Sequence, residues 1–167
     1  ITNVLSRLAE LAEQSANGVF STGQRSALQL EFDALLSEVE RIAMTTEFNG
    51  VMLLSGGGQV TMQVGFDGTS ASQITYSGVQ ATLASLGLAN SGTSTPLFSI
   101  NAANTLEAQS AARLALDAIN DAIVSVTRNR GTLGAAESRL ETTIQNLMTA
   151  RENFTAAESR IRDADVA

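Results

Sequence analysis

Apolar residues follow a helical period over the first part of the chain. One set recurs at spacings of three and four residues and consists of Val4, Leu5, Leu8, Leu11 and Ala12. This spacing places the set on one face of a helix. We expect Asn17-Gly18 to end that helix, because glycine adopts the left-handed conformation of helix ends at little cost.

A second and stricter apolar seam follows Ser26. Its members step by four, three, four and three residues and are Leu28, Phe32, Leu35, Val39 and Ile42. The repeat resembles a heptad, and it predicts a second helix that is interrupted at Asn49-Gly50.

The middle stretch from Ser55 to Ser99 has a composition that opposes helix, with Gly56-Gly57-Gly58 and many Ser and Thr residues. Apolar residues instead alternate with polar ones at Val60, Met62 and Val64, and again at Ile74 and Tyr76. Alternation of this kind predicts short strands. The segment Gly65-Phe66-Asp67-Gly68 offers turn residues, so we expect a β-hairpin.

From Ala102 the helical period returns and persists to the end of the chain. The apolar positions are Leu116, Ile119, Ile123, Val126, Leu133, Leu140, Ile144, Leu147, Phe154 and Ile161. Gly131 and Gly134 lie inside this run, and each costs about 1 kcal/mol relative to Ala within a helix. The glycines are compatible with a helix-turn-helix, but the unbroken period favours one helix of about 60 residues, on the order of 90 Å long.

These patterns predict a mainly α fold. We expect an elongated antiparallel helical bundle or coiled-coil rod, with two shorter N-terminal helices, one long C-terminal helix and a small β-hairpin region between them. The expected segments are residues 1–50, residues 51–101 and residues 102–167. Any helical bundle has apolar seams. The apolar period therefore predicts a helical rod but says nothing about what the rod does.

Composition narrows the function classes. The chain of 167 residues has no Cys and no His, so the usual thiolate and imidazole ligands and the usual neutral-pH base are missing. We therefore predict no enzyme activity, no cofactor and no metal. The net charge of −7 disfavours nucleic acid and anionic membranes as partners. No apolar run approaches the roughly 20 residues of a membrane span.

Two blocks of sequence, one near each end of the chain, resemble bacterial flagellin. Near the start are Leu5-Ser6-Arg7-Leu8-Ala9-Glu10-Leu11-Ala12-Glu13-Gln14-Ser15-Ala16-Asn17-Gly18 and Glu47-Phe48-Asn49-Gly50-Val51. Near the end are Leu133-Gly134-Ala135-Ala136-Glu137-Ser138-Arg139-Leu140 and Ala157-Glu158-Ser159-Arg160-Ile161-Arg162-Asp163-Ala164-Asp165. Their length and order make a chance match a small risk.

The resemblance implies a structural subunit of the bacterial flagellar filament, with other flagellin subunits as partners. It also implies an extracellular location in the flagellum, reached through the flagellar export apparatus. The flanking segments would form one core rod domain without variable outer domains. A hook-filament junction protein, which shares such helical ends, is the alternative.

The chain lacks an initiator Met, and we interpret it as a fragment. The polymerising terminal helices of the family would then lie outside it, so we expect it to polymerise poorly. Residues 144–161 would lack their usual helical partner. Because exposed apolar surface is unfavourable by roughly 25 cal/mol per Å², we expect this part to fray or to pair with another copy of the chain.

Flagellins are also ligands of the flagellin-sensing Toll-like receptor. The positions that match the family's receptor-binding surface are Arg7, Leu11, Glu31 and Arg139. Arg7 suits an interface anchor because a guanidinium offers five donors in one plane. The alternative is that Arg7 pairs with Glu10 or with the backbone of the first turn as an ordinary solvated charge. Ala9 stands where many recognised flagellins carry a second basic residue. The absence of that charge would weaken the electrostatic contribution to receptor binding without abolishing it.

Three further motifs have simpler interpretations. Asp163 and Asp165 are spaced as in some calcium loops, but the remaining loop ligands are missing, which favours a charged helix end. Asn153-Phe154-Thr155 satisfies a glycosylation sequon, but Phe154 lies on the apolar seam. The hydroxyl cluster at Ser91 and Thr93-Ser94-Thr95 is compatible with modification or with a plain loop.

Overall fold

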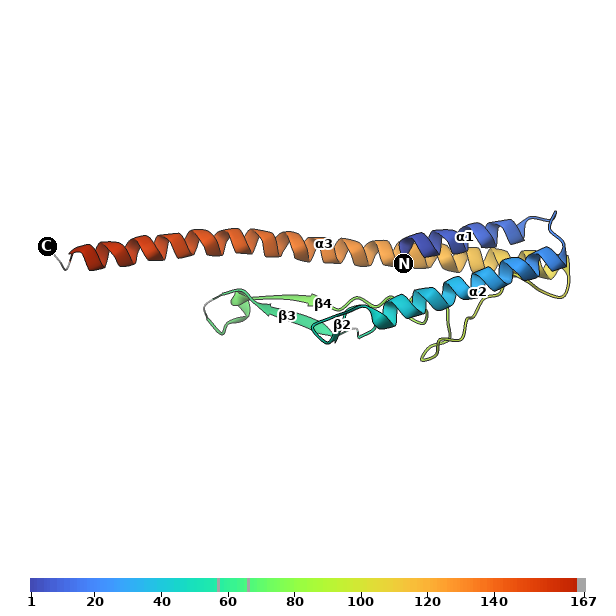
Figure 1. Cartoon of the computed structure of the whole chain (residues 1–167), viewed down its shortest axis with the longest axis horizontal. Coiled ribbons are helices and arrows are strands. Elements are labelled where there is room, and N and C mark those ends of the chain that lie inside the picture. Colours follow the sequence, from blue (N-terminus) through green and yellow to red (C-terminus); the bar gives the residue numbers. More distant parts are fainter. Residues whose placement is uncertain (57, 66, 165–167) are drawn as a thin grey trace. The chain divides into compact units, whose positions relative to one another are not determined.

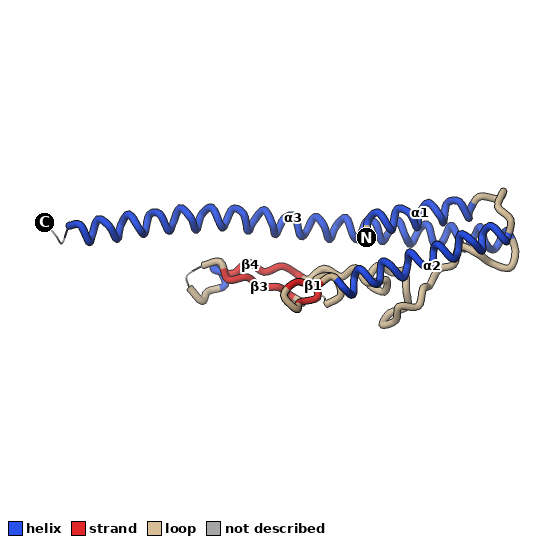
Figure 2. The backbone as a smooth tube through the Cα atoms, in the orientation of Figure 1, coloured by secondary structure: helices blue, strands red, loops and turns tan. Residues whose placement is uncertain are grey.

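A computed structural model describes residues 1–56, 58–65 and 67–164 (Figures 1 and 2). The helices are α1 (Thr2–Ala16), α2 (Thr22–Thr45) and α3 (Thr105–Ala164), with a short 3₁₀ helix at Ser70–Ser72. The strands are β1 (Glu47–Phe48), β2 (Val51–Met52), β3 (Gln59–Gln63) and β4 (Gln73–Ser77). The prediction of a mainly α fold with a small hairpin region is confirmed.

The chain forms two compact units. Unit 1 comprises residues 1–58 and 77–130, and unit 2 comprises residues 59–76 and 131–167. Each unit therefore combines pieces of different sequence segments, and α3 contributes its first part to unit 1 and its second part to unit 2.

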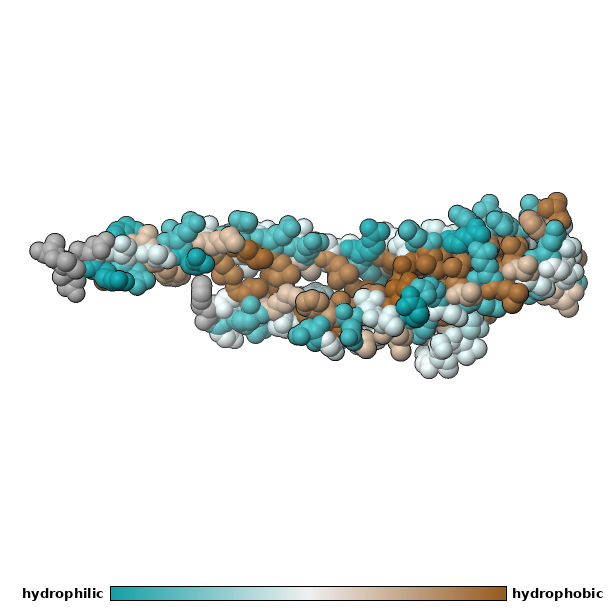
Figure 3. Space-filling model, viewed as in Figure 1, coloured by the Kyte–Doolittle hydropathy of each residue, from teal (hydrophilic) through white to brown (hydrophobic). Residues whose placement is uncertain are grey.

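A single apolar cluster holds unit 1 together. In Figure 1, α1 and α2 run alongside the first part of α3, and the side chains between them are buried. Leu5, Leu8 and Leu11 of α1 are fully buried. They meet Phe32, Leu36 and Val39 of α2, together with Ala112, Ala115, Ile119 and Ala122 of α3. Figure 3 shows hydrophobic side chains of this unit gathered between the helices.

The end of α1 lies where it was expected, but the mechanism was wrong. The helix stops at Ala16, and its C-cap residue Asn17 is extended, with φ −75° and ψ 132°. Gly18 has no positive φ. A Cβ on Gly18 would lie 2.8 Å from Nε2 of Gln109, the end of a flexible side chain that can move aside, so this contact does not require glycine.

Helix α2 begins earlier than its apolar seam indicated. Ser21 is the N-cap: its Oγ accepts a hydrogen bond from the backbone N–H of Gln24, and the Gln24 side chain accepts one from the backbone N–H of Ser21. This capping box satisfies two donors at the helix start.

The role expected for Asn49-Gly50 was also wrong, because α2 ends at Thr45, before this dipeptide. Asn49 (φ 51°) and Gly50 (φ 76°) form the two-residue turn between β1 and β2, whose antiparallel register pairs Phe48 with Val51. Two successive residues with positive φ are typical of the tight turns that match strand twist.

The segment between β4 and α3 belongs to unit 1, and hydrogen bonds between its backbone and side chains of α1 and α2 hold it in place. The N–H of Leu83 donates to Oε2 of Glu40 at 2.7 Å. Ile100 donates its N–H to Oε1 of Gln29 at 2.7 Å, and its carbonyl accepts from the Ser15 hydroxyl. Asn104 then caps α3 by accepting from the N–H of Glu107 at 2.9 Å.

Unit 2 contains the expected hairpin, formed by β3 and β4. Asp67 organises its connection by accepting hydrogen bonds from the hydroxyls of Thr69 and Ser72. Gly65 packs so closely on Ser72 that a Cβ there would overlap its side chain. Of the predicted turn, Phe66 lies outside the described residues, as does Gly57 of the preceding glycine run.

Helix α3 is continuous through Gly131 and Gly134, so the single long helix is confirmed over the helix-turn-helix. The seam that it continues into unit 2 is largely exposed: the exposed fractions are 49% for Ile144, 65% for Phe154 and 75% for Ile161. The expectation that residues 144–161 fray or pair with another copy stays a prediction.

None of the described helices combines the length and apolar character that a membrane crossing needs. Within the same residues there is no cluster of three or more acidic side chains arranged to hold a metal ion.

Candidate interaction surface

Arg7 joins α1 to α2 on the surface of unit 1. Its Nε lies 2.8 Å from Oε1 of Glu31, and its Nη1 lies 3.0 Å from Oε2 of Glu10. The Glu31 and Glu10 hydrogen bonds raise the pKa of Arg7, so the guanidinium is held charged. The structure thus brings together two predicted site residues, Arg7 and Glu31, which are 24 positions apart. The pairing of Arg7 with Glu10 is confirmed as well.

Helix packing fixes the position of this ion pair. Leu8, which follows Arg7, is fully buried, and Phe32, which follows Glu31, is 1% exposed. Each charged residue therefore sits at the edge of the α1–α2 seam with its neighbour anchored in the core. Leu30, which precedes Glu31 in the sequence, is 74% exposed and adds an apolar side chain to this surface.

Leu11 differs from the other predicted site residues because its side chain is fully buried in the apolar cluster. It holds α1 against its neighbours, and in this conformation it offers no surface for a partner to contact. We designate Arg7, Glu10, Leu30 and Glu31 the α1–α2 surface.

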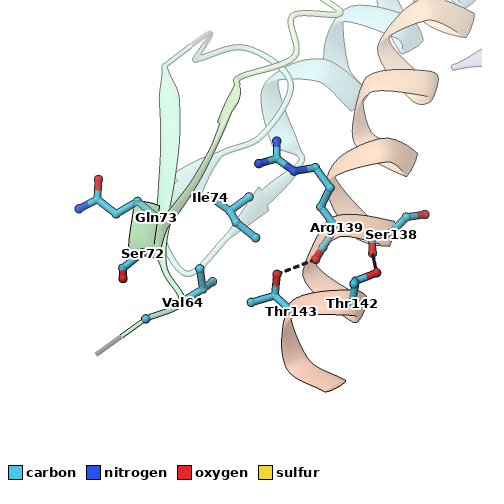
Figure 4. Close-up of a pocket in the computed structure, with 9 residues that line it drawn as sticks. Val64, Ser72, Gln73, Ile74, Ser138, Arg139, Thr142 and Thr143 are labelled. Atoms are coloured by element: carbon cyan, nitrogen blue, oxygen red, sulfur yellow. Dashed lines mark hydrogen bonds between the residues drawn. The ribbon is translucent and has the colours of Figure 1, made fainter. Parts of the chain in front are cut away.

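Arg139 belongs to unit 2 and lines a shallow cavity of about 520 Å³ (Figure 4). Ile74 and Val64 of the hairpin and Thr143 of α3 also line it. Figure 4 shows that Arg139 rises from α3 and that its carbonyl accepts a hydrogen bond from the Thr143 hydroxyl, at 2.8 Å.

Arg25 is a functional candidate that sequence reasoning missed. It is fully buried, its Nε donates to the carbonyl of Ser15 at 3.0 Å, and its Nη2 donates to the carbonyl of Asn17 at 2.8 Å. Its position could have indicated burial, because Arg25 lies three residues before Leu28 and so falls on the same helical face as the apolar seam of α2.

The remaining motifs add no site. Asp165 lies outside the described residues, so the proposed pair with Asp163 is not described. Phe154 of the sequon is 65% exposed. In the hydroxyl cluster, Thr93 donates to the carbonyl of Asn90 at 3.2 Å, as turn hydroxyls commonly do.

These features are those of a helical structural protein, and two family models identify which kind. Residues 1–59 match the bacterial flagellin N-terminal helical region, and residues 116–167 match the bacterial flagellin C-terminal helical region. The chain belongs to the bacterial flagellin family, whose members are structural proteins rather than enzymes.

Individual relatives agree with this assignment. The chain is 36% identical to the flagellar filament 33 kDa core protein of Treponema phagedenis, over 99% of this chain and 59% of that protein. It is also 36% identical to a flagellin of Halalkalibacterium halodurans, over 100% of this chain and 57% of the relative. The chain thus spans just under three-fifths of the length of these relatives.

Solved structures support the fold. The crystal structure of Bacillus cereus flagellin matches with a TM-score of 0.68 at 24% identity, over 93% of this chain and 82% of that one. A structure from Burkholderia pseudomallei, of the protein FliC, matches with a TM-score of 0.56 at 23% identity, over 83% of this chain and 93% of that one.

Proposed function

We propose that this chain is part of a structural subunit of the bacterial flagellar filament, extracellular and delivered by the flagellar export apparatus. Relatives named as filament core proteins support the proposal. The observation that carries it is the exposed apolar seam of α3 in unit 2, where Ile144 is 49% exposed and Ile161 is 75% exposed. Burial of such a seam against another subunit is favourable by roughly 25 cal/mol per Å².

Filament assembly tests this proposal. The natural gene product that contains this sequence should form filaments, visible by electron microscopy, in a bacterium whose own flagellin gene is deleted. The double variant Ile144→Glu/Ile161→Glu should be exported but should form few filaments. Glu152→Gln, an exposed change on the same stretch of helix, is the matched control. Normal filaments from the double variant, or none from the exported natural protein, would contradict the proposal.

We further propose that the α1–α2 surface binds the flagellin-sensing Toll-like receptor. The surface ion pair of Arg7 with Glu31 supports this, since both residues match the positions that the family resemblance implies. A paired guanidinium is preorganised in one geometry, which lowers the ordering cost of binding. Arg139 is proposed as a separate contact, and Leu11 as the residue that holds α1 in place beneath the surface.

A receptor reporter assay separates this role from simple structure. Arg7→Ala should weaken activation by about tenfold or more, as expected for an interface anchor worth more than about 1.4 kcal/mol. Arg41→Ala is the matched control, because Arg41 makes a comparable surface pair with Glu38 on α2. Equal activation by the natural protein and by Arg7→Ala would refute the anchor role.

A further inference from the structure

The buried Arg25 is unusual in its partners. Among the residues that the structure describes, no carboxylate forms an ion pair with it, and its Nη1 has no hydrogen-bond partner. Its two bonds go to the carbonyls of Ser15 and Asn17, at the end of α1. A charge buried with incomplete pairing is weak evidence for stability, since an apolar side chain of similar volume is often as stable or more so.

The apolar seam between α1 and α2 leaves the axial register of the two helices weakly specified. Leu5, Leu8 and Leu11 of α1 are spaced by three residues, and the buried apolar residues of α2, Phe32, Leu36 and Val39, are spaced by four and three. A slip by one helical turn, about 5 Å, would pair leucines with other apolar residues of the same seam. Apolar contact alone distinguishes poorly between such registers, because it has no direction.

Hydrogen bonds from Arg25 can distinguish between these helix registers. Only the last carbonyls of a helix lack intrahelical partners, so acceptors for a guanidinium exist at one place along α1. We propose that Arg25 is a register-specifying residue: by binding the carbonyls of Ser15 and Asn17 it selects the one alignment of α1 with α2 in which Arg7 reaches Glu31. Buried polar groups have this role at single positions of coiled coils.

A distance measurement tests the proposal directly. The chain has no cysteine, so Glu13→Cys and Ser37→Cys place two spin labels on exposed positions of α1 and α2 without other changes. Pulsed electron spin resonance of the full chain should give one narrow distance distribution. In the Arg25→Met background we expect a second population displaced by about 5 Å, one helical turn. Arg41→Met, the same substitution on the exposed surface of α2, should leave a single population.

Arg25→Lys provides the second variant. Lysine keeps the charge but has one nitrogen, so it cannot hold both carbonyls in a fixed plane, and we expect a smaller displaced population. A single unshifted distance in folded Arg25→Met would overturn the proposal and leave the short α1–α2 connection as the register determinant. If circular dichroism shows that Arg25→Met has lost its helices, the test rests on Arg25→Lys. An unshifted distance in Arg25→Lys then overturns the proposal. The measurement lies within the chain, so its result is independent of the filament and receptor proposals.

Discussion

Replacing Gly131 and Gly134 by alanine should stabilise the protein. Both glycines lie inside α3, neither has a positive φ, and a Cβ on either would have nothing within 4 Å. Alanine then loses less backbone freedom on folding, with no steric cost. Each substitution should raise the free energy of unfolding by about 0.5–1 kcal/mol. The double variant should therefore gain about 1–2 kcal/mol, which corresponds to an increase in Tm of roughly 2–8 °C for a chain of this size.

Gly50→Ala is the matched control for this prediction. A Cβ on Gly50 also has nothing within 4 Å, but its φ is +76°, which is a strained conformation for alanine. This variant should lose about 1–2 kcal/mol. Urea unfolding followed by circular dichroism at 222 nm measures all three proteins. If Gly131→Ala/Gly134→Ala destabilised the protein as Gly50→Ala should, α3 would have a turn at these glycines and the continuous helix would be refuted.

Three other substitutions test the packing and the loops. Phe32→Ala should cost about 3–5 kcal/mol of unfolding free energy by leaving a cavity in the unit 1 core, and a loss below about 1 kcal/mol would contradict its burial there. Glu40→Ala should cost about 1–3 kcal/mol, because it leaves the N–H of Leu83 without an acceptor; hydrogen exchange at that amide should rise. The Ser72 hydroxyl lowers the pKa of Asp67, so stability from this carboxylate is present above its ordinary pKa and is lost as the pH falls through the lowered value. An NMR titration should give Asp67 a midpoint below 3.8, and Ser72→Ala should move that midpoint upward.

Periodicity predicted the helices, while local chemistry decided where they begin and end. The period of α3 outweighed its two glycines, because the cost of two glycines is small against packing along a long helix. The start of α2 was missed although Ser21 and Gln24 have the spacing of a capping box. The β1–β2 hairpin was missed because Asn49-Gly50 ends a helical pattern and begins a turn equally well.

The candidate surface was only partly accessible to sequence reasoning. Arg7 and Glu10 are three residues apart on one helix, so their pairing follows from helical geometry alone. The approach of Glu31 depends on the register of α1 against α2, which no local pattern encodes. Leu11 illustrates the opposite problem, because its place in the apolar set already predicted burial, whereas the family resemblance predicted a binding role.

The two parts of α3 show how one apolar period can have two different fates. In unit 1 the buried face is built mostly from small residues, Ala108, Ala112, Ala115 and Ala122, which let other helices approach closely. In unit 2 the period continues with large residues, yet Ile144 is 49% exposed and Ile161 is 75% exposed. A monomer gains nothing from large apolar side chains in water. Their place in the apolar register therefore argues that a further helix packs on this face, in line with the expectation that residues 144–161 lack their usual helical partner.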